Sequence, residues 1–480
     1  MMSNWIDWQW DNIAGASSGG DLFEIIKSQR DTIMTRDQLQ STMAEVIDGI
    51  RLFDTHEHIV DERVRMAETL DFTYFMPHYL SSDLVSAGMP LDELEAIRAP
   101  GRAMRDALRS AIYPRDPGYP FPERLPDHQP TLLEKWRRFA PFWARVRNTG
   151  YARCVLTAIR DLFGIGDLNE KTVEALSVAL QDSKKKGWYH YVLKERARID
   201  LSVLDCGGTD VDRSLFAPSI RFDRFVDIRD LIDVQRLEYE TDMAIHSLND
   251  LVKALEADMA RKVQDGMIAV KTGLAYQRII QYDDVTQHDA EQVFNRLFRH
   301  TVQRLSWEEA KPFQDYMMHQ VIRQAIEHRR PIQIHTGLQE GNGNLIANSR
   351  PTHLVNLFIR YPNAKFDLFH AGYPYHHELS TLAKNFPNVY ADLCWVPIIS
   401  PTLAAQILHE WLETIPVSKI LAFGGDFIIV EGAYGHATMA RQVVSKVLSD
   451  KVRVGLYSEE EAATFGRMIL RENAQQLFGL

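Results

Sequence analysis

Five ionisable side chains stand where short apolar runs of the sequence end. An His-x-His pair closes residues 50–58, and two further histidines close the runs 331–335 and 366–370. An aspartate follows the run 421–425, which ends in two glycines that leave room for a ligand. Imidazole and carboxylate groups are ligands for divalent metals such as zinc. The candidate metal and acid–base residues are therefore His56, His58, His335, His370 and Asp426.

The His-x-His pair indicates a metal site more strongly when the other three residues are considered with it. Successive side chains of a strand point to opposite faces, so His56 and His58 point the same way. One histidine after a buried strand is commonly structural, and an aspartate after a strand commonly caps the next helix. Five such residues at the ends of different strands are an improbable coincidence, and together they predict a metal site.

Alternating strands and helices must position these residues. Runs with helical patterning separate the apolar runs, and this order is typical of a parallel sheet. Eight such units predict a (β/α)8 TIM barrel, whose active site lies at the carboxyl ends of the strands. The expected strands are the run before His56 and Ile199–Leu204, Ile220–Val226, Met267–Lys271, Ile332–His335, Lys365–His370, Val389–Leu393 and Ile420–Gly424.

A large helical insertion is expected after the first strand. Residues 60–196 carry helical patterning with Pro-rich interruptions, and a structureless loop of this size is implausible in a compact domain. The expected organisation is an N-terminal helix and first strand over 1–59, an inserted helical subdomain over 60–196, and the rest of the barrel over 197–480. Within the insertion, helices are expected over 132–146 and 169–181.

Composition excludes several classes of protein. The 480 residues carry a formal charge of −11 and no basic tract, which argues against nucleic acid or an anionic membrane as a partner. No apolar stretch is long enough to span a bilayer. Three scattered cysteines and no signal peptide predict a protein of the reducing cytoplasm. The Trp- and Phe-rich insertion favours a homo-oligomer, and the expected ligand is a small molecule.

The pattern of His-x-His, two further histidines and an aspartate resembles the amidohydrolase superfamily, and more narrowly its uronate isomerase-like branch. The likeness is carried by Asp54-Thr-His-Glu-His58, by His370-Ala-Gly-Tyr-Pro-Tyr375, and by Gly425-Asp426 with His436 in the loop beyond. Stretches 139–143 and 162–165 of the insertion and the terminal Arg471-Glu-Asn-Ala474 helix add to it.

The resemblance implies one divalent metal ion, zinc with manganese as the alternative. It places His56, His58 and Asp426 on the metal with His335 as a fourth ligand, and makes His370 a catalytic or substrate-orienting base. In hydrolytic members the metal activates a water molecule and polarises the substrate carbonyl. Asp426 then carries the proton from that water to the leaving group.

Several other residues are candidates for binding substrate. Lys271 ends the fourth strand. In dinuclear members of the superfamily a carboxylated lysine on this strand bridges two metals, but Lys271 is expected here to bind a substrate carboxylate. Arg278 and Arg350 are weaker candidates of the same kind, because loop arginines are commonly just solvated. Trp395 is expected to wall the pocket or to cover the barrel end.

Two reactions compete on this evidence. The five-residue constellation favours a hydrolase that cleaves an amide-type C–N bond of a small carboxylate-bearing substrate. The insertion and His436 favour a uronate isomerase, in which His370 or Tyr373 would move a proton between neighbouring carbons. Uronate isomerases carry an arginine soon after the eighth-strand aspartate, whereas here the apolar run 427–430 follows Asp426, so hydrolysis is preferred. A non-oxidative decarboxylase and a non-catalytic binding protein are less favoured.

Overall fold

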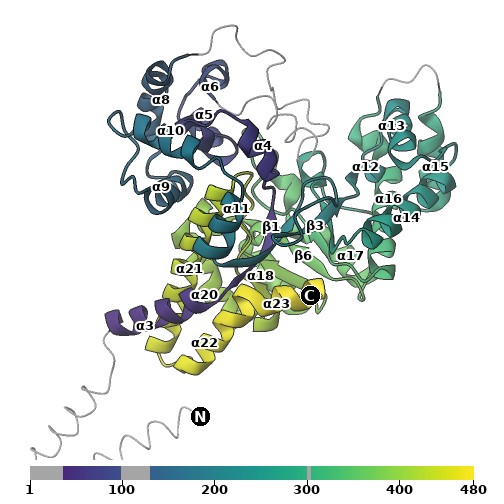
Figure 1. Cartoon of the computed structure of the whole chain (residues 1–480). Coiled ribbons are helices and arrows are strands. Elements are labelled where there is room, and N and C mark those ends of the chain that lie inside the picture. The colour runs from purple at the N-terminus through teal and green to yellow at the C-terminus, as the bar shows by residue number, and fades with distance from the viewer. Residues whose placement is uncertain (1–35, 99–129, 300–303) are drawn as a thin grey trace, which may run out of the picture.

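A computed structural model describes residues 36–98, 130–299 and 304–480 (Figure 1). Eight parallel strands pair in the order β1 to β8, each with its neighbour in sequence. The (β/α)8 barrel is confirmed, with its strands surrounded by helices. The strands are β1 (Leu52–Glu57), β2 (Ile199–Leu204), β3 (Phe216–Arg221), β4 (Ala269–Thr272), β5 (Ile332–Ile334), β6 (Phe366–Leu368), β7 (Val389–Asp392) and β8 (Ile420–Leu421).

One predicted strand was misplaced. The expected strand over 220–226 lies four residues earlier, at β3, and Asp223–Val226 forms the short helix α12. The apolar residues Phe225 and Val226 that supported the prediction are completely buried, but they are buried as part of a helix. The strand over 199–204 has the predicted bounds, and the other predicted strands overlap the observed ones with differences of one to three residues at one or both ends.

The segment after β8 closes the barrel against β1. Thr55 N donates to Phe423 O at 3.1 Å, and Asp426 N donates to His56 O at 2.8 Å. These bonds continue the ladder beyond the two residues of β8. They also fix Asp426 directly beside the His-x-His pair, so barrel closure itself builds part of the site.

The described parts of the insertion between β1 and β2 are helical, as predicted. They form a group above the barrel in the purple to dark blue part of Figure 1. α8 begins and ends where the sequence predicted it, and α10 begins four residues later than expected. The main helices are α4 (Glu62–Ala67), α5 (Tyr79–Ser86), α6 (Leu91–Ile97), α8 (Leu132–Val146), α9 (Gly150–Phe163) and α10 (Val173–Asp182).

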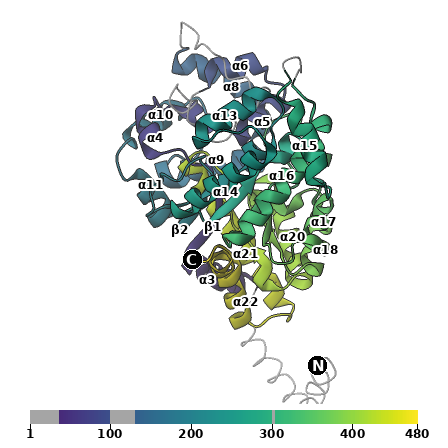
Figure 2. The same cartoon turned by 90° about the vertical axis from the view of Figure 1, so that its right-hand side faces the viewer.

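A second group of helices connects β3 to β5 and lies to the other side of the barrel in Figure 1. Figure 2, turned by 90°, shows the same helices toward the viewer. No helix in the described ranges has both the length and the apolar character needed to cross a bilayer. The group comprises α12, α13 (Leu231–Thr241), α14 (Leu248–Gln264), α15 (Gln287–Arg296) and α16 (Trp307–Glu327).

The C-terminal helix covers the barrel opposite the carboxyl ends of the strands. In α23 (Asn473–Phe478), Phe478 stacks on Phe53 of β1 with ring centroids 5.7 Å apart. The N-terminal helix α3 (Arg36–Gly49) packs on α21 (Val430–Arg453), which follows β8. The N-terminal helix expected within residues 1–59 is confirmed over Arg36–Gly49, and residues 1–35 lie outside the described residues.

Candidate metal centre

The His-x-His pair and Asp426 converge at the carboxyl end of the barrel. His56 Nε2 and His58 Nε2 lie 3.1 Å apart. Asp426 Oδ1 lies 3.7 Å from the first of these nitrogens and 3.3 Å from the second. All three side chains are buried. Three ligand atoms this close to one another can share one divalent ion.

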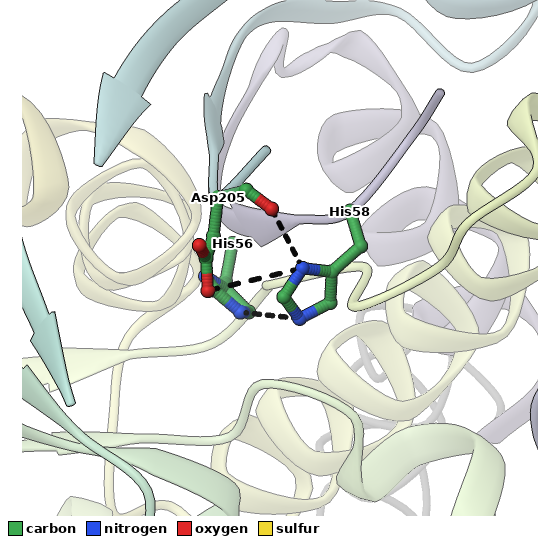
Figure 3. A group of neighbouring side chains, drawn as sticks. All are labelled: His56, His58 and Asp205. Atoms are coloured by element: carbon green, nitrogen blue, oxygen red, sulfur yellow. Dashed lines mark hydrogen bonds and ion pairs between the residues drawn. The ribbon is translucent and has the colours of Figure 1, made fainter. Parts of the chain in front are cut away.

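A backbone carbonyl orients His58. Its Nδ1 lies 2.8 Å from the Asp205 carbonyl oxygen and 3.8 Å from the Asp205 carboxylate, and this directs Nε2 toward His56 (Figure 3). A carbonyl accepts a hydrogen bond, so the proton of the neutral ring sits on Nδ1 and Nε2 carries a lone pair. Metal-binding histidines are commonly oriented in this way.

His335 and His370 show the same arrangement. His335 Nε2 lies 2.9 Å from Leu338 O, and His370 Nδ1 lies 3.0 Å from Cys394 O. Their remaining nitrogens, His335 Nδ1 and His370 Nε2, face each other at 3.1 Å. Burial lowers the pKa of both imidazoles well below the usual value, so both rings are neutral. Each of the two facing nitrogens therefore carries a lone pair and no proton.

Facing lone pairs repel each other unless a cation lies between them. The His335–His370 pair thus fits a bound metal better than an empty polar core. His370 Nε2 also lies 3.8 Å from Asp426 Oδ2, so the carboxylate has one oxygen toward each histidine pair. The donor set of neutral imidazoles and a carboxylate suits a divalent ion.

Lys271 lies inside this cluster. Its Nζ is 3.5 Å from His56 Nε2 and 3.7 Å from the centre of the Phe369 ring. Burial, followed by the nearby Arg221, lowers the pKa of the Lys271 ammonium to about 8. The structure thus brings Lys271 together with the predicted ligands, while its binding of a substrate carboxylate stays a prediction.

Aromatic side chains wall the site on the side of the insertion. Trp395 is buried, meets His370 edge-on at 5.2 Å, and stacks on Tyr79 at 4.7 Å. Tyr79 in turn stacks on Tyr151 of α9 at 5.0 Å. The Tyr79 hydroxyl donates to the backbone oxygen of Asp426. The insertion therefore reaches the centre directly, while the substrate contact expected of Trp395 stays a prediction.

His78 was missed by the sequence analysis. Its ring lies 6.4 Å from that of His58 and 3.9 Å from that of Tyr79, and its Nδ1 is buried without a hydrogen-bond partner. Its backbone has φ 71° and ψ −128°, a strained conformation for a residue other than glycine. Such strain is commonly found at functional sites. Only folding of the insertion brings His78 here, so its position in sequence gave no signal.

Asp205 and Arg221 were also missed. They follow β2 and end β3, and Arg221 Nε donates to Asp205 Oδ2 at 2.6 Å. The sequence did contain a signal for these two residues, because both stand at strand ends like the five predicted residues. The misplaced third strand hid Arg221, which the sequence prediction put inside that strand rather than at its end.

The remaining predicted substrate residues make their contacts elsewhere. Arg278 is buried, and its guanidinium donates to Gln314 and Asp315 of α16, a structural role. Arg350 is about half exposed and ion-pairs with Glu378. These contacts lend no support to substrate binding by either arginine. Tyr373 is half-buried at the turn that follows β6.

His436 is corrected in position. The sequence placed it in a loop, but it lies in helix α21 and is completely buried. Its Nδ1 is 2.9 Å from Gly425 O, and its ring contacts Phe423 and Phe427. It therefore supports the segment that carries Asp426. These contacts suit a positioning residue better than a substrate ligand.

Comparison with known proteins agrees with this architecture. A family model described as amidohydrolase matches residues 297–480, and one described as glucuronate isomerase matches residues 178–349. Over 224 residues the chain is 30% identical to protein fluG of Emericella nidulans, a match covering 45% of the chain and 26% of that relative. The match thus spans about a quarter of the curated relative.

Solved structures share the fold. A glucuronate isomerase from Caulobacter crescentus aligns with a TM-score of 0.70 and 18% identity over 92% of this chain and 94% of that one. A uronate isomerase from Thermotoga maritima aligns with a TM-score of 0.67 and 16% identity over 93% and 99%. The chain is thus similar over parts of its length to the amidohydrolase and glucuronate isomerase families, and it shares its barrel fold with uronate isomerases.

Proposed function

We propose that this enzyme is a metal-dependent hydrolase that cleaves an amide-type C–N bond of a small substrate bearing a carboxylate. The observation that carries the proposal is the placement of Asp426 between the two histidine pairs. One carboxylate oxygen faces the His-x-His pair and the other faces His370. A single group is thus placed both to hold a metal ion and to handle a proton beside it.

His56, His58 and Asp426 would hold the ion, with His335 as the predicted fourth ligand. When bound, a divalent ion such as zinc lowers the pKa of water and polarises a carbonyl. Burial raises the pKa of the Asp426 carboxyl to about 7, and a cation bound beside it would favour the charged form that accepts a proton. Asp426 would take the proton of the attacking water and deliver it to the leaving nitrogen.

The chemistry of the pocket supports a substrate with one charged end and an apolar body. Lys271 is a buried cation beside the histidines and Arg221 is a partly buried one, and both could attract a carboxylate. Phe427, Ile428 and Ile429 are buried directly after Asp426, and Phe427 packs edge-on against Tyr79, whose ring stacks on Trp395. Apolar and aromatic walls suit an N-acyl or aryl group better than the hydroxyls of a sugar.

A uronate isomerase is the second candidate. It is favoured by the match of residues 178–349 to the glucuronate isomerase family. It is also favoured by His78 and Tyr79, polar groups that the insertion places beside the metal-binding residues. In this reaction Asp426 or His370 would move a proton between neighbouring carbons of the substrate.

Proton NMR of the zinc-loaded enzyme separates the two reactions. The panel comprises N-acyl amino acids and amino-acid anilides together with glucuronate and galacturonate. Release of an amine from a member of the first group supports hydrolysis. Conversion of a uronate to its ketose, with all amides intact, would replace the hydrolase proposal with the isomerase.

The three cysteines support the proposed cytoplasmic location. Cys154, Cys206 and Cys394 are all free thiols in the structure. Free buried thiols are typical of reducing compartments. A homo-oligomer formed through the insertion remains part of the same proposal.

A further inference from the structure

One cysteine lies among the candidate metal ligands. Cys394 follows β7 by two residues and is completely buried. Its Sγ, a nitrogen of His370 and a carboxylate oxygen of Asp426 all lie within 4.8 Å of one another. In a tetrahedral zinc site, neighbouring sulfur, nitrogen and oxygen ligands are about 3.3–3.6 Å apart, so these atoms would need to approach one another by at most about 1.3 Å to share one ion.

The surrounding backbone holds the thiol in this place. Cys394 N donates to Asp392 Oδ1 at 2.7 Å, and Cys394 O accepts from His370 Nδ1. A Cβ atom at Gly424 would lie 2.8 Å from Cys394 Sγ, so glycine at that position leaves space for the sulfur next to the strand that leads to Asp426. The same residue thus orients His370 through its carbonyl and directs its sulfur toward the site.

We propose that Cys394 is a thiolate ligand of a divalent cation held together with His370 and Asp426, and that it makes the site select zinc over manganese. Thiolate is a soft ligand that favours zinc, whereas carboxylate and water also suit manganese. In this arrangement His370 is a metal ligand rather than a base. The inference concerns the metal and is compatible with both reactions; in an isomerase it would leave Asp426, rather than His370, to move the proton.

Cobalt substitution tests the sulfur–metal bond directly. Thiolate bound to Co²⁺ gives an intense charge-transfer band in the near ultraviolet, whereas nitrogen and oxygen ligands give only weak visible bands. We expect this band in the cobalt-loaded wild-type enzyme and in Cys154→Ser, which alters a buried thiol of α9. We expect it to be absent from Cys394→Ser and Cys394→Ala, with the weak visible bands retained.

Metal affinity, measured by competition with a chelator, tests the selectivity. Cys394→Ser should weaken zinc binding by at least about tenfold and leave manganese binding nearly unchanged. Absence of the charge-transfer band from the wild-type enzyme would overturn the proposal, and so would an equal change in the affinity for both metals. The wild-type spectrum decides even if a Cys394 variant fails to fold. Because these readouts do not use turnover, failure of the hydrolase proposal would leave them unaffected.

Discussion

At the scale of single residues, the site depends on how each imidazole is oriented. Backbone carbonyls of Asp205, Leu338 and Cys394 accept from one nitrogen of His58, His335 and His370 and leave the other free. In a buried site, neutral rings with free lone pairs need a cation or a hydrogen-bond donor as a partner. The orientation of these rings, more than their identity, makes the cluster a candidate metal centre.

Asp426→Asn tests proton transfer. The amide keeps nearly the same shape and hydrogen bonds but cannot accept the proton of the attacking water. We expect kcat for the substrate identified in the NMR panel to fall by about 10²–10⁴. His377→Asn, at an exposed histidine that pairs with Glu410, serves as the control and should keep full activity. An Asp426→Asn enzyme within threefold of wild type would remove Asp426 from the mechanism.

The backbone strain at His78 can be tested by comparing two substitutions of this residue. Glycine adopts the φ of 71° without strain, whereas alanine does not. Both His78→Gly and His78→Ala lose the ring, so the comparison isolates the backbone. We expect the glycine variant to be more stable in urea unfolding by about 1–3 kcal/mol, with both variants impaired in catalysis. Equal stability of the two would show that the backbone at this position carries no strain.

At the scale of elements, the insertion is held to the barrel by a buried ion pair. Arg65 Nη2 of α4 lies 2.5 Å from Glu431 Oε1 of α21, and neither side chain has any exposed surface. Trp188 Nε1 also donates to Glu431 at 2.8 Å. Because Glu431 stands five residues after Asp426, this contact ties the insertion to the segment that carries the central carboxylate.

Arg65→Met should therefore be costly. It leaves Glu431 charged, buried and without its cation, a loss of about 3–5 kcal/mol in the free energy of unfolding. Arg350→Met, which breaks the exposed pair with Glu378, should change it far less than Arg65→Met does, because solvent screens that pair. Urea unfolding of both variants measures the difference. Similar losses in the two would mean that burial of the Arg65 pair is not what holds the insertion.

The sequence predicted the barrel well because its signal is local. Apolar runs marked the strands, and polar residues at their ends marked the site. Tyr79 and His78, which belong to the insertion, reach the site only through tertiary packing. The periodicity of apolar residues in the sequence carries no information about that packing. Cys394 was noted only for its distance from other cysteines, because its neighbours His370 and Asp426 come from other strands.

At the scale of the whole molecule, the barrel interior beneath the metal centre is unusually acidic. Asp54, Asp367 and Asp392 come from three strands and are completely buried. Burial raises the pKa of Asp54 to about 6 and of Asp367 to about 7, and that of Asp392 well above its usual value. Gln333 Nε2 donates to Asp367 Oδ2 at 3.1 Å.

This interior predicts a stability that falls as pH rises. The folded chain keeps the Asp367 proton up to about pH 7, whereas the unfolded chain releases it near pH 4. Between these values the folded state loses up to about 1.4 kcal/mol of stability per unit of pH through this group. Asp367→Asn should remove that slope and be more stable than wild type at pH 8, with the difference vanishing near pH 4. The assignment would be contradicted if the free energy of unfolding changed with pH in the same way for both proteins across this range.

The count of metal ions per chain tests the central claim most directly. Inductively coupled plasma mass spectrometry on the wild-type enzyme and on His58→Asn, after removal of loosely bound metal, gives this number. The arrangement of lone pairs predicts at least one tightly bound divalent ion per wild-type chain, zinc before manganese, and its loss from His58→Asn while His377→Asn keeps it. A wild-type enzyme that stays fully active without metal, or equal metal in His58→Asn, would contradict the account.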